Sequence, residues 1–328
     1  MSEIVYCGPF KEHITSFVEL KQAVGYKYLA ESAHLKRFDT FLYEKYPQIK
    51  ALTKSIILDW CQRRSYEAQA NQCTRASILR QFCIYLDSVG VMAYIMPNGY
   101  YPVEPQYIPH IYTPDELKRF FDQTDRCHFC VECPTRHLIM PVFFRMIYMC
   151  GLRVSEARLL KVGDVDLNNG VLCIHHSKKD NSRLVPMSPT LIRYCRNYSA
   201  GILSMPMADD YYFPGIAGKP MTIANVYNNF RRFLWHAGIS HGGRGSGPRI
   251  YDFRHAFAVH CLKRWSEQGH DLLVYLPILK TFMGHDSFED TAYYLRLTAD
   301  MYPEITLKLE QRFPALIPEL GGYAYGTD

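Results

Sequence analysis

Residues 282–296 read FMGHDSFEDTAYYLR, and the interpretation of the whole chain starts from this stretch. Gly284 is typical of a residue that ends a helix, because glycine readily adopts the left-handed conformation found there. Ser287, followed three residues later by Asp290, is typical of the start of another helix. The stretch therefore predicts two helices joined by a short turn.

His285 lies in that turn, and Tyr293 and Tyr294 lie on the second helix. Histidine changes its charge most easily near neutral pH, whereas a tyrosine hydroxyl stays protonated until about pH 10. Such a hydroxyl attacks only a strongly electrophilic target, for example a phosphate that cations have neutralised. Neighbours on a helix point about 100° apart, so one tyrosine can face the target, and we expect Tyr294 to do so while Tyr293 packs.

The upstream sequence supplies such cations in three places. Arg153 follows a glycine turn at a predicted helix start, where Glu156, one turn later, would orient it. Tyr251 and Arg254 stand one helical turn apart and would share a face of another helix. The third place is a predicted hairpin turn with the sequence SKKDNSR at residues 177–183, which presents Lys178 and Lys179.

The order of patterns along the chain predicts two domains. Residues 10–90 show helical spacing throughout, and the stretch 96–109 is too rich in proline and glycine for a regular element. We place a helical domain at 1–108 and a second domain at 109–328, opening with a helix at Thr113 and Pro114. Short alternating segments between residues 165 and 187 predict a small antiparallel sheet within an otherwise helical fold.

Composition is that of an ordinary globular protein, with 328 residues, 48% apolar residues and 21% charged residues. No apolar run is long enough to span a bilayer, and the N-terminus lacks the pattern of a signal peptide, so we expect a cytoplasmic protein. The net charge of +5 permits nucleic-acid binding without demonstrating it. The 11 cysteines are expected to be reduced thiols.

The ordered set of motifs resembles that of the tyrosine recombinases of the phage-integrase family. The resemblance covers the second domain, and the first domain is similar to the family's helical core-binding domain. It places Arg153 and Arg254 at the two arginine positions and Lys178 at the hairpin lysine position. His285 takes the downstream histidine position, and Tyr294 takes that of the nucleophile.

The resemblance implies a mainly α fold with a small antiparallel β-sheet, and an enzyme that cuts and rejoins DNA strands without metal, ATP or another cofactor. Two guanidinium groups would bind the phosphodiester, Tyr294 would attack it to give a 3′-phosphotyrosine, and Lys178 would protonate the leaving 5′ oxygen. His285 would hydrogen-bond the phosphate or help to move the tyrosine proton. The implied partner is double-stranded DNA, bound by a tetramer that exchanges C-terminal segments, with no membrane involved.

Tyr251 departs from the family pattern, which usually has histidine three residues before its second arginine. A phenol is a poor general base at neutral pH, so we expect Tyr251 to position the phosphate. The departure leaves open an accessory DNA-binding protein of the same fold that has lost the chemistry.

Other basic residues and a cysteine cluster offer further expectations. We expect Arg75, Arg80 and Lys179 to contact DNA phosphates, with a solvated helix face as the alternative for the first two. A second alternative is a zinc module or metal-dependent nuclease built on Cys127, Cys130, Cys133 and His137. This cluster shows only half of the usual zinc-ligand spacing, so we expect a reduced surface loop and no metal.

Overall fold

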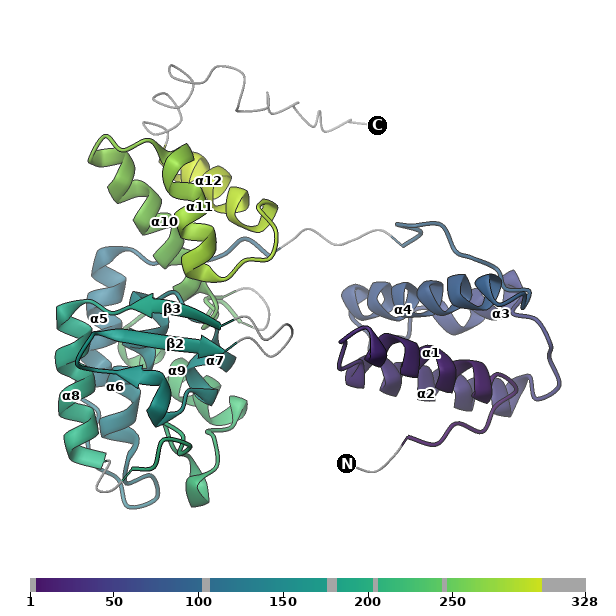
Figure 1. The fold of residues 1–328 in the computed structure, drawn as a ribbon, viewed down its shortest axis with the longest axis horizontal. Helices are drawn as coiled ribbons and strands as arrows, with labels where there is room; N and C mark the ends of the chain where they lie inside the picture. The colour runs from purple at the N-terminus through teal and green to yellow at the C-terminus, as the bar shows by residue number, and fades with distance from the viewer. Residues whose placement is uncertain (1–3, 102–106, 176–181, 203–205, 244–246, 303–328) are drawn as a thin grey trace. The chain divides into compact units, whose positions relative to one another are not determined.

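The computed structural model describes residues 4–101, 107–175, 182–202, 206–243 and 247–302 (Figure 1). The chain divides into two compact units, residues 1–107 and 108–328. The predicted boundary after residue 108 lies one residue from this division. No helix among the described residues is both long enough and apolar enough to cross a membrane.

The first unit is a small helical bundle, as its spacing predicted. Its helices are α1 (Lys11–Ala23), α2 (Leu29–Lys45), α3 (Lys54–Cys61) and α4 (Gln69–Ser88). Leu35, Phe38 and Leu42 recur at helical spacing on α2 and are buried, because this spacing places them on one face. Phe17 of α1 and Phe82 of α4 meet in the same core, with ring centroids 5.5 Å apart.

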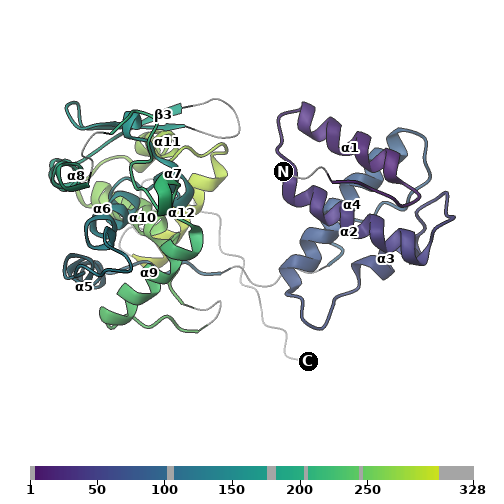
Figure 2. The ribbon, with the colours of Figure 1, turned by 90° about the horizontal axis from the view of Figure 1, so that it is seen from below.

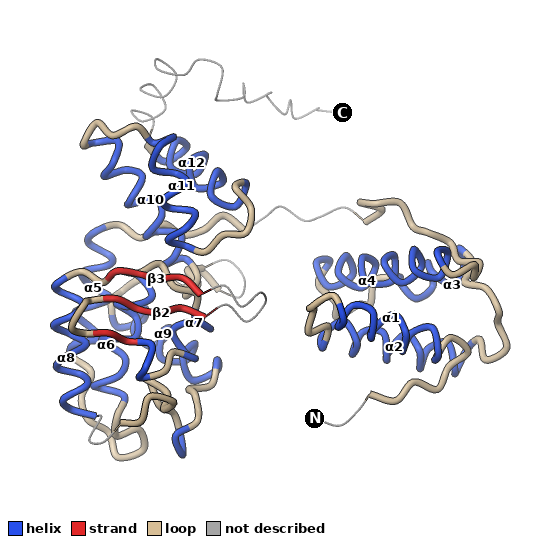
Figure 3. The backbone as a smooth tube through the Cα atoms, viewed as in Figure 1, coloured by secondary structure: helices blue, strands red, loops and turns tan. Residues whose placement is uncertain are grey.

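The second unit is mainly helical and contains one small sheet, which confirms the predicted fold class (Figure 3). Its described elements follow the order α5 (Pro114–Asp125), α6 (Arg136–Met149), α7 (Val154–Leu159), η1 (Val162–Asp164), β1 (Val165–Asp166), β2 (Val171–His175), β3 (Ser182–Pro186), α8 (Pro189–Ile202), η2 (Ile216–Gly218), α9 (Ile223–His236), α10 (Asp252–Glu267), α11 (Leu272–Met283) and α12 (Glu289–Met301).

The helix starts and turns that the sequence predicted are present. Thr113 caps α5 with a capping box, in which its hydroxyl accepts a hydrogen bond from the Glu116 amide. Gly284 ends α11 in the left-handed conformation, with a φ of 64°. Ser287 accepts a hydrogen bond from the Asp290 amide at the start of α12.

The sheet has the strand order β1-β2-β3, and both pairs are antiparallel, as predicted. Leu172 and Ile174 of β2 alternate with exposed or half-buried neighbours, and Arg183 and Val185 of β3 are buried in the same alternation. Figure 2 shows α11 beside β3, and the two elements contact each other. One edge of the sheet is thereby brought to the helices that carry the candidate site.

The centre of the second unit is α6, whose residues from Ile139 to Ile147 are buried. This helix packs against α5, α8 and α10. Phe253, near the start of α10, stacks on Tyr112 with ring centroids 4.7 Å apart. Phe120 of α5 and Phe144 of α6 contact each other edge to face in the same aromatic core. The core fixes the end of α6 relative to the start of α10.

Gly151, after the end of α6, has a φ of 58°, and a Cβ built there would lie 2.6 Å from the Phe257 ring. Gly151→Ala is therefore expected to destabilise the fold by about 2 kcal/mol or more, because backbone strain and a steric clash add together. Gly269→Ala is the matched control, since Gly269 has a φ of 76° but open space around it. The difference in thermal stability between the two variants measures the contribution of the steric clash. Equal losses of stability would show that the Phe257 ring moves aside at no cost.

Candidate active site

Arg153 lies immediately before α7 and is fixed by Glu156, as the sequence predicted. The Glu156 carboxylate accepts hydrogen bonds from the Arg153 backbone amide and from Nη1, both at 2.8 Å. Arg153 Nη2 donates a hydrogen bond at 3.0 Å to the carbonyl of Gly284, the residue that ends α11. The Arg153 side chain remains 31% exposed, so one side of its guanidinium is open to a ligand.

Arg183, on β3, is a member of this cluster that the sequence analysis did not single out. Its Nη1 and Nη2 donate to the two oxygens of Glu156, both at 2.9 Å, and its Nε donates to the carbonyl of Phe282 at 2.9 Å. This two-pronged pairing is the geometry in which arginine binds a carboxylate most strongly. Arg183 thereby ties β3 to the start of α7 and the end of α11.

Arg254 is completely buried. Its Nη1 donates to the Gly151 carbonyl and its Nη2 donates to the Met283 carbonyl, both at 2.6 Å, and Nη1 lies 4.0 Å from Glu156. Burial lowers the pKa of this guanidinium, and the nearby positive charge of Arg153 lowers it further. Two guanidinium groups from distant parts of the chain are thus held close to one carboxylate.

Glu156 balances the charge of these arginines. Burial raises its pKa, but the hydrogen bonds and positive charge of Arg183, with those of Arg153, outweigh burial and hold the pKa at about 2. The carboxylate is therefore ionised at neutral pH, where it can orient the arginines for an anionic ligand.

Glu156→Gln is expected to lose a pH-dependent part of the stability. A carboxylate whose pKa falls from 4.5 to about 2 on folding contributes about 3 kcal/mol above pH 4.5, and this contribution is lost as the pH falls towards 2. The difference in free energy of unfolding between wild type and variant should shrink by about 1 kcal/mol between about pH 6 and about pH 3.5.

Urea unfolding at the two pH values measures this difference. Glu267→Gln provides the control in the same unit, because the Glu267–Lys263 pair is exposed and contributes little. A Glu156→Gln difference that stays constant with pH would contradict the assignment of Glu156 as the carboxylate that binds the arginines.

His285 lies between α11 and α12 beside the candidate nucleophile. Its Nδ1 is 2.8 Å from the Thr291 hydroxyl, and its ring stacks on that of Tyr294 at a centroid distance of 5.7 Å. Burial lowers the pKa of His285 to about 4, assisted by the positive charges of Arg254 and Arg153. The imidazole is therefore neutral at pH 7 and can accept or donate a hydrogen bond to a phosphate or a phenol.

Tyr294 is 2% exposed, whereas Tyr293 is 37% exposed. The expectation that Tyr293 is the packed residue is therefore wrong in this structure, because α12 turns the face that carries Tyr294 towards α10. Burial raises the pKa of the Tyr294 hydroxyl, and the positive charge of Arg254 opposes this effect. Tyr294 is close to the arginine and histidine cluster, but its hydroxyl is shielded from solvent in this conformation.

Tyr251, just before α10, is 41% exposed and points its ring towards His255 at a centroid distance of 4.9 Å. His255 also contacts the ring of Tyr294 at 5.4 Å, and its buried Nδ1 has no hydrogen-bond partner among the residues that the structure describes. His260, on the same helix, makes a 3.0 Å hydrogen bond through Nδ1 with the Tyr148 hydroxyl. His255 instead contacts both tyrosines of the candidate site.

The predicted lysines and the DNA-contacting arginines have mixed outcomes. Lys178 and Lys179 lie outside the described residues. The structure corrects the prediction for Arg75, which is 3% exposed and forms a 2.7 Å ion pair with Glu67 and hydrogen bonds to the carbonyls of Trp60 and Gln62. Its guanidinium holds the first unit together and is not presented to DNA. Arg80 donates through Nε to the Met96 carbonyl and stays a prediction.

Cys127, Cys130 and Cys133 lie in the loop between α5 and α6 as free thiols. Within the described ranges, no group of three or more histidine, cysteine, aspartate or glutamate side chains is arranged to hold a metal ion. The loop cysteines therefore give no support to the zinc alternative.

Comparison with known proteins finds a family match that lies within the second unit of the chain. Residues 111–301 match the model of the phage integrase family. The chain is 28% identical to the Sinorhizobium fredii protein y4rB, whose name places it among integrases and recombinases, over 310 residues covering 93% of this chain and 98% of that protein. It is 24% identical to a tyrosine recombinase of Pseudothermotoga lettingae over 272 residues, covering 80% of this chain and 84% of the relative.

Solved structures show the same fold. The XerH site-specific recombinase in a post-cleavage complex with its palindromic difH substrate aligns with a TM-score of 0.64 at 20% identity, covering 86% of this chain and 77% of that chain. The Tn1549 transposon integrase in complex with circular intermediate DNA aligns with a TM-score of 0.63 at 16% identity, covering 86% of this chain and 94% of that one.

Proposed function

Because the chain belongs to the phage integrase family of tyrosine recombinases, we propose that it cuts and rejoins DNA strands through a 3′-phosphotyrosine formed on Tyr294. The observation that carries the proposal is the convergence of four sequence-distant side chains. Arg153 and Arg254 both lie close to the carboxylate of Glu156. They donate hydrogen bonds to the backbone carbonyls of Gly284 and Met283, respectively. His285, the residue after Gly284, stacks on the ring of Tyr294.

The chemistry follows from the charges. A phosphodiester carries a negative charge that repels an incoming oxygen, and guanidinium groups that bind its non-bridging oxygens neutralise that charge. The Tyr294 oxygen then forms a bond to phosphorus while the bond to the 5′ oxygen breaks, and the phenol proton passes to the neutral imidazole of His285. The leaving oxygen receives a proton from Lys178. No metal and no ATP are required, because the phosphotyrosine ester conserves the phosphodiester energy for the reverse attack by a 5′-hydroxyl.

Because Tyr294 is buried, the proposed reaction requires a change in conformation before the tyrosine can attack. The Tyr294 ring contacts the rings of His255 and His285 and is 2% exposed, so these contacts must open before a phosphate held by the arginines can meet the hydroxyl. A movement of α12 relative to α10 would release it. Double-stranded DNA is the proposed substrate, and a tetramer on DNA that exchanges C-terminal segments is the proposed assembly.

The test is a duplex with a nick close to the cleavage position, which traps the covalent intermediate because the short 5′ fragment diffuses away. In EDTA, the full chain should form an adduct that resists denaturant and releases a phosphotyrosine peptide on digestion. DNA binding without any adduct on candidate sites, including the DNA that flanks the coding region, would instead support the accessory protein that the departure at Tyr251 left open.

A further inference from the structure

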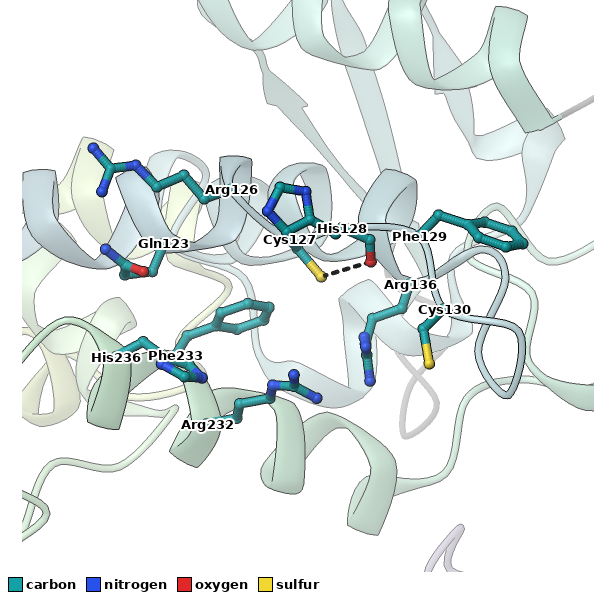
Figure 4. A pocket seen from close by; sticks show the side chains of 10 residues that line it. All are labelled: Gln123, Arg126, Cys127, His128, Phe129, Cys130, Arg136, Arg232, Phe233 and His236. Atoms are coloured by element: carbon teal, nitrogen blue, oxygen red, sulfur yellow. Dashed lines mark hydrogen bonds between the residues drawn. The ribbon is translucent and has the colours of Figure 1, made fainter.

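A second cationic site lies at the other end of α6. A cavity of about 360 Å³, partly open to solvent, is lined by the end of α5, the following loop, the first residue of α6 and the last turns of α9 (Figure 4). None of the described residues that line it is acidic. Its lining includes three arginines and two histidines, which are Arg126, His128, Arg136, Arg232 and His236. The site therefore favours an anion.

The arginines of this cavity differ from their neighbours in how their charge is balanced. Arg145 and Arg119, on the adjacent helices, pair with Asp125 and Asp115 at 2.7 Å and 2.8 Å. Within the described part of the chain, Arg126, Arg136 and Arg232 form no ion pair with a carboxylate. The half-buried Arg136 interacts with the Cys127 thiol and lies near the charge of Glu132, but its buried Nε makes no hydrogen bond there. A buried guanidinium donor without an acceptor is costly, and an anionic ligand would satisfy it.

The geometry suits a ligand with one phosphate and an organic part. Figure 4 shows Arg136 from α6 and Arg232 from α9 reaching toward the same space, with the ring of Phe233 along one side. Guanidinium groups from two elements match the oxygens of a phosphate, while the Phe233 ring, which is only 2% exposed, gives the space an apolar side. The volume lies at the lower end of the range for small-molecule sites.

The cavity does not belong to the candidate active site. Arg136 begins α6, and the 14-residue helix leads away to Gly151 and Arg153. At 1.5 Å per residue the two sites are separated by about 20 Å along this helix, which is longer than one phosphate contact can bridge. We propose that the cavity binds a small phosphate monoester of about mononucleotide size, and that this binding is independent of the DNA cleavage site.

Calorimetric titration of the full chain tests the proposal with adenosine monophosphate, ribose 5-phosphate, inorganic phosphate and adenosine as probes. The two sugar phosphates should bind, and adenosine should bind at least about tenfold more weakly, because charge-assisted hydrogen bonds to the phosphate carry the affinity. Arg232→Gln and Arg136→Gln should each weaken binding about tenfold or more. Arg231→Gln, the adjacent exposed arginine that lies over the Tyr227 ring, should change it less than about twofold.

Three outcomes would overturn the proposal. The first is no measurable binding of either sugar phosphate at millimolar concentration. The second is equal affinity in Arg232→Gln, whose exposed side chain can change without unfolding the protein, and in the Arg231→Gln control. The third is loss of sugar phosphate binding whenever duplex DNA is bound, together with weaker DNA binding by Arg232→Gln, which would make the cavity a contact for the DNA backbone.

Discussion

Tyr294→Phe is expected to abolish the covalent protein–DNA adduct, with at least about a thousandfold loss of cleavage, because no other group replaces a missing nucleophile. The change removes one hydroxyl and keeps the ring that contacts His255 and His285. Affinity for duplex DNA should stay within about twofold of wild type, since the arginines proposed to bind the phosphate are untouched.

Tyr293→Phe is the matched control, because Tyr293 is the next residue on α12 and points about 100° away. Adduct formation should persist in this variant. The burial of Tyr294 makes the comparison decisive, since the more exposed Tyr293 reaches solvent in the described conformation. An adduct that persists in Tyr294→Phe and disappears in Tyr293→Phe would show that the buried tyrosine is structural and that its neighbour attacks the phosphate.

The fold was predictable wherever local physics decides it. The helix start at Thr113 and Pro114, the helix end at Gly284 and the short alternating strands each depend on a few neighbouring residues, and each is present as predicted. The pairing of Arg153 with Glu156 was predictable for the same reason, because three residues along a helix bring side chains together.

The parts of the site that depend on tertiary packing were not predictable from spacing. Arg183 follows a lysine-rich turn and was not singled out from the sequence, yet it joins Glu156 across 27 positions of the sequence. An alternation signal was available, since Arg183 occupies an inward position of β3 where an apolar residue is usual. Which of two adjacent tyrosines is buried depends on how α12 meets α10, and the fate of Arg75 depends on Glu67 in a preceding loop.

Arg254→Ala is expected to slow cleavage by about a hundredfold or more, the usual effect of removing a preorganised charge at a developing oxyanion. It should also destabilise the protein by about 3 kcal/mol, because the carbonyls of Gly151 and Met283 lose their buried donors. Cleavage is measured as adduct formation under single turnover, and stability by urea unfolding of the same preparations.

Arg153→Ala separates the two effects, because the Arg153 side chain is about a third exposed and its removal leaves Arg183 on Glu156. It should lose a similar factor in cleavage with less than about half of the stability loss, because exposed ion pairs contribute little to folding. Arg254→Lys keeps a positive charge, but a lysine amine cannot donate to both carbonyls at once as the guanidinium does. Compared with Arg254→Ala, it should recover part of the stability and little of the cleavage rate. Normal cleavage in Arg153→Ala or Arg254→Ala would show that this arginine does not bind the phosphate. Parallel losses of rate and stability in all three variants would show that the cluster only holds α7, α10 and α11 together.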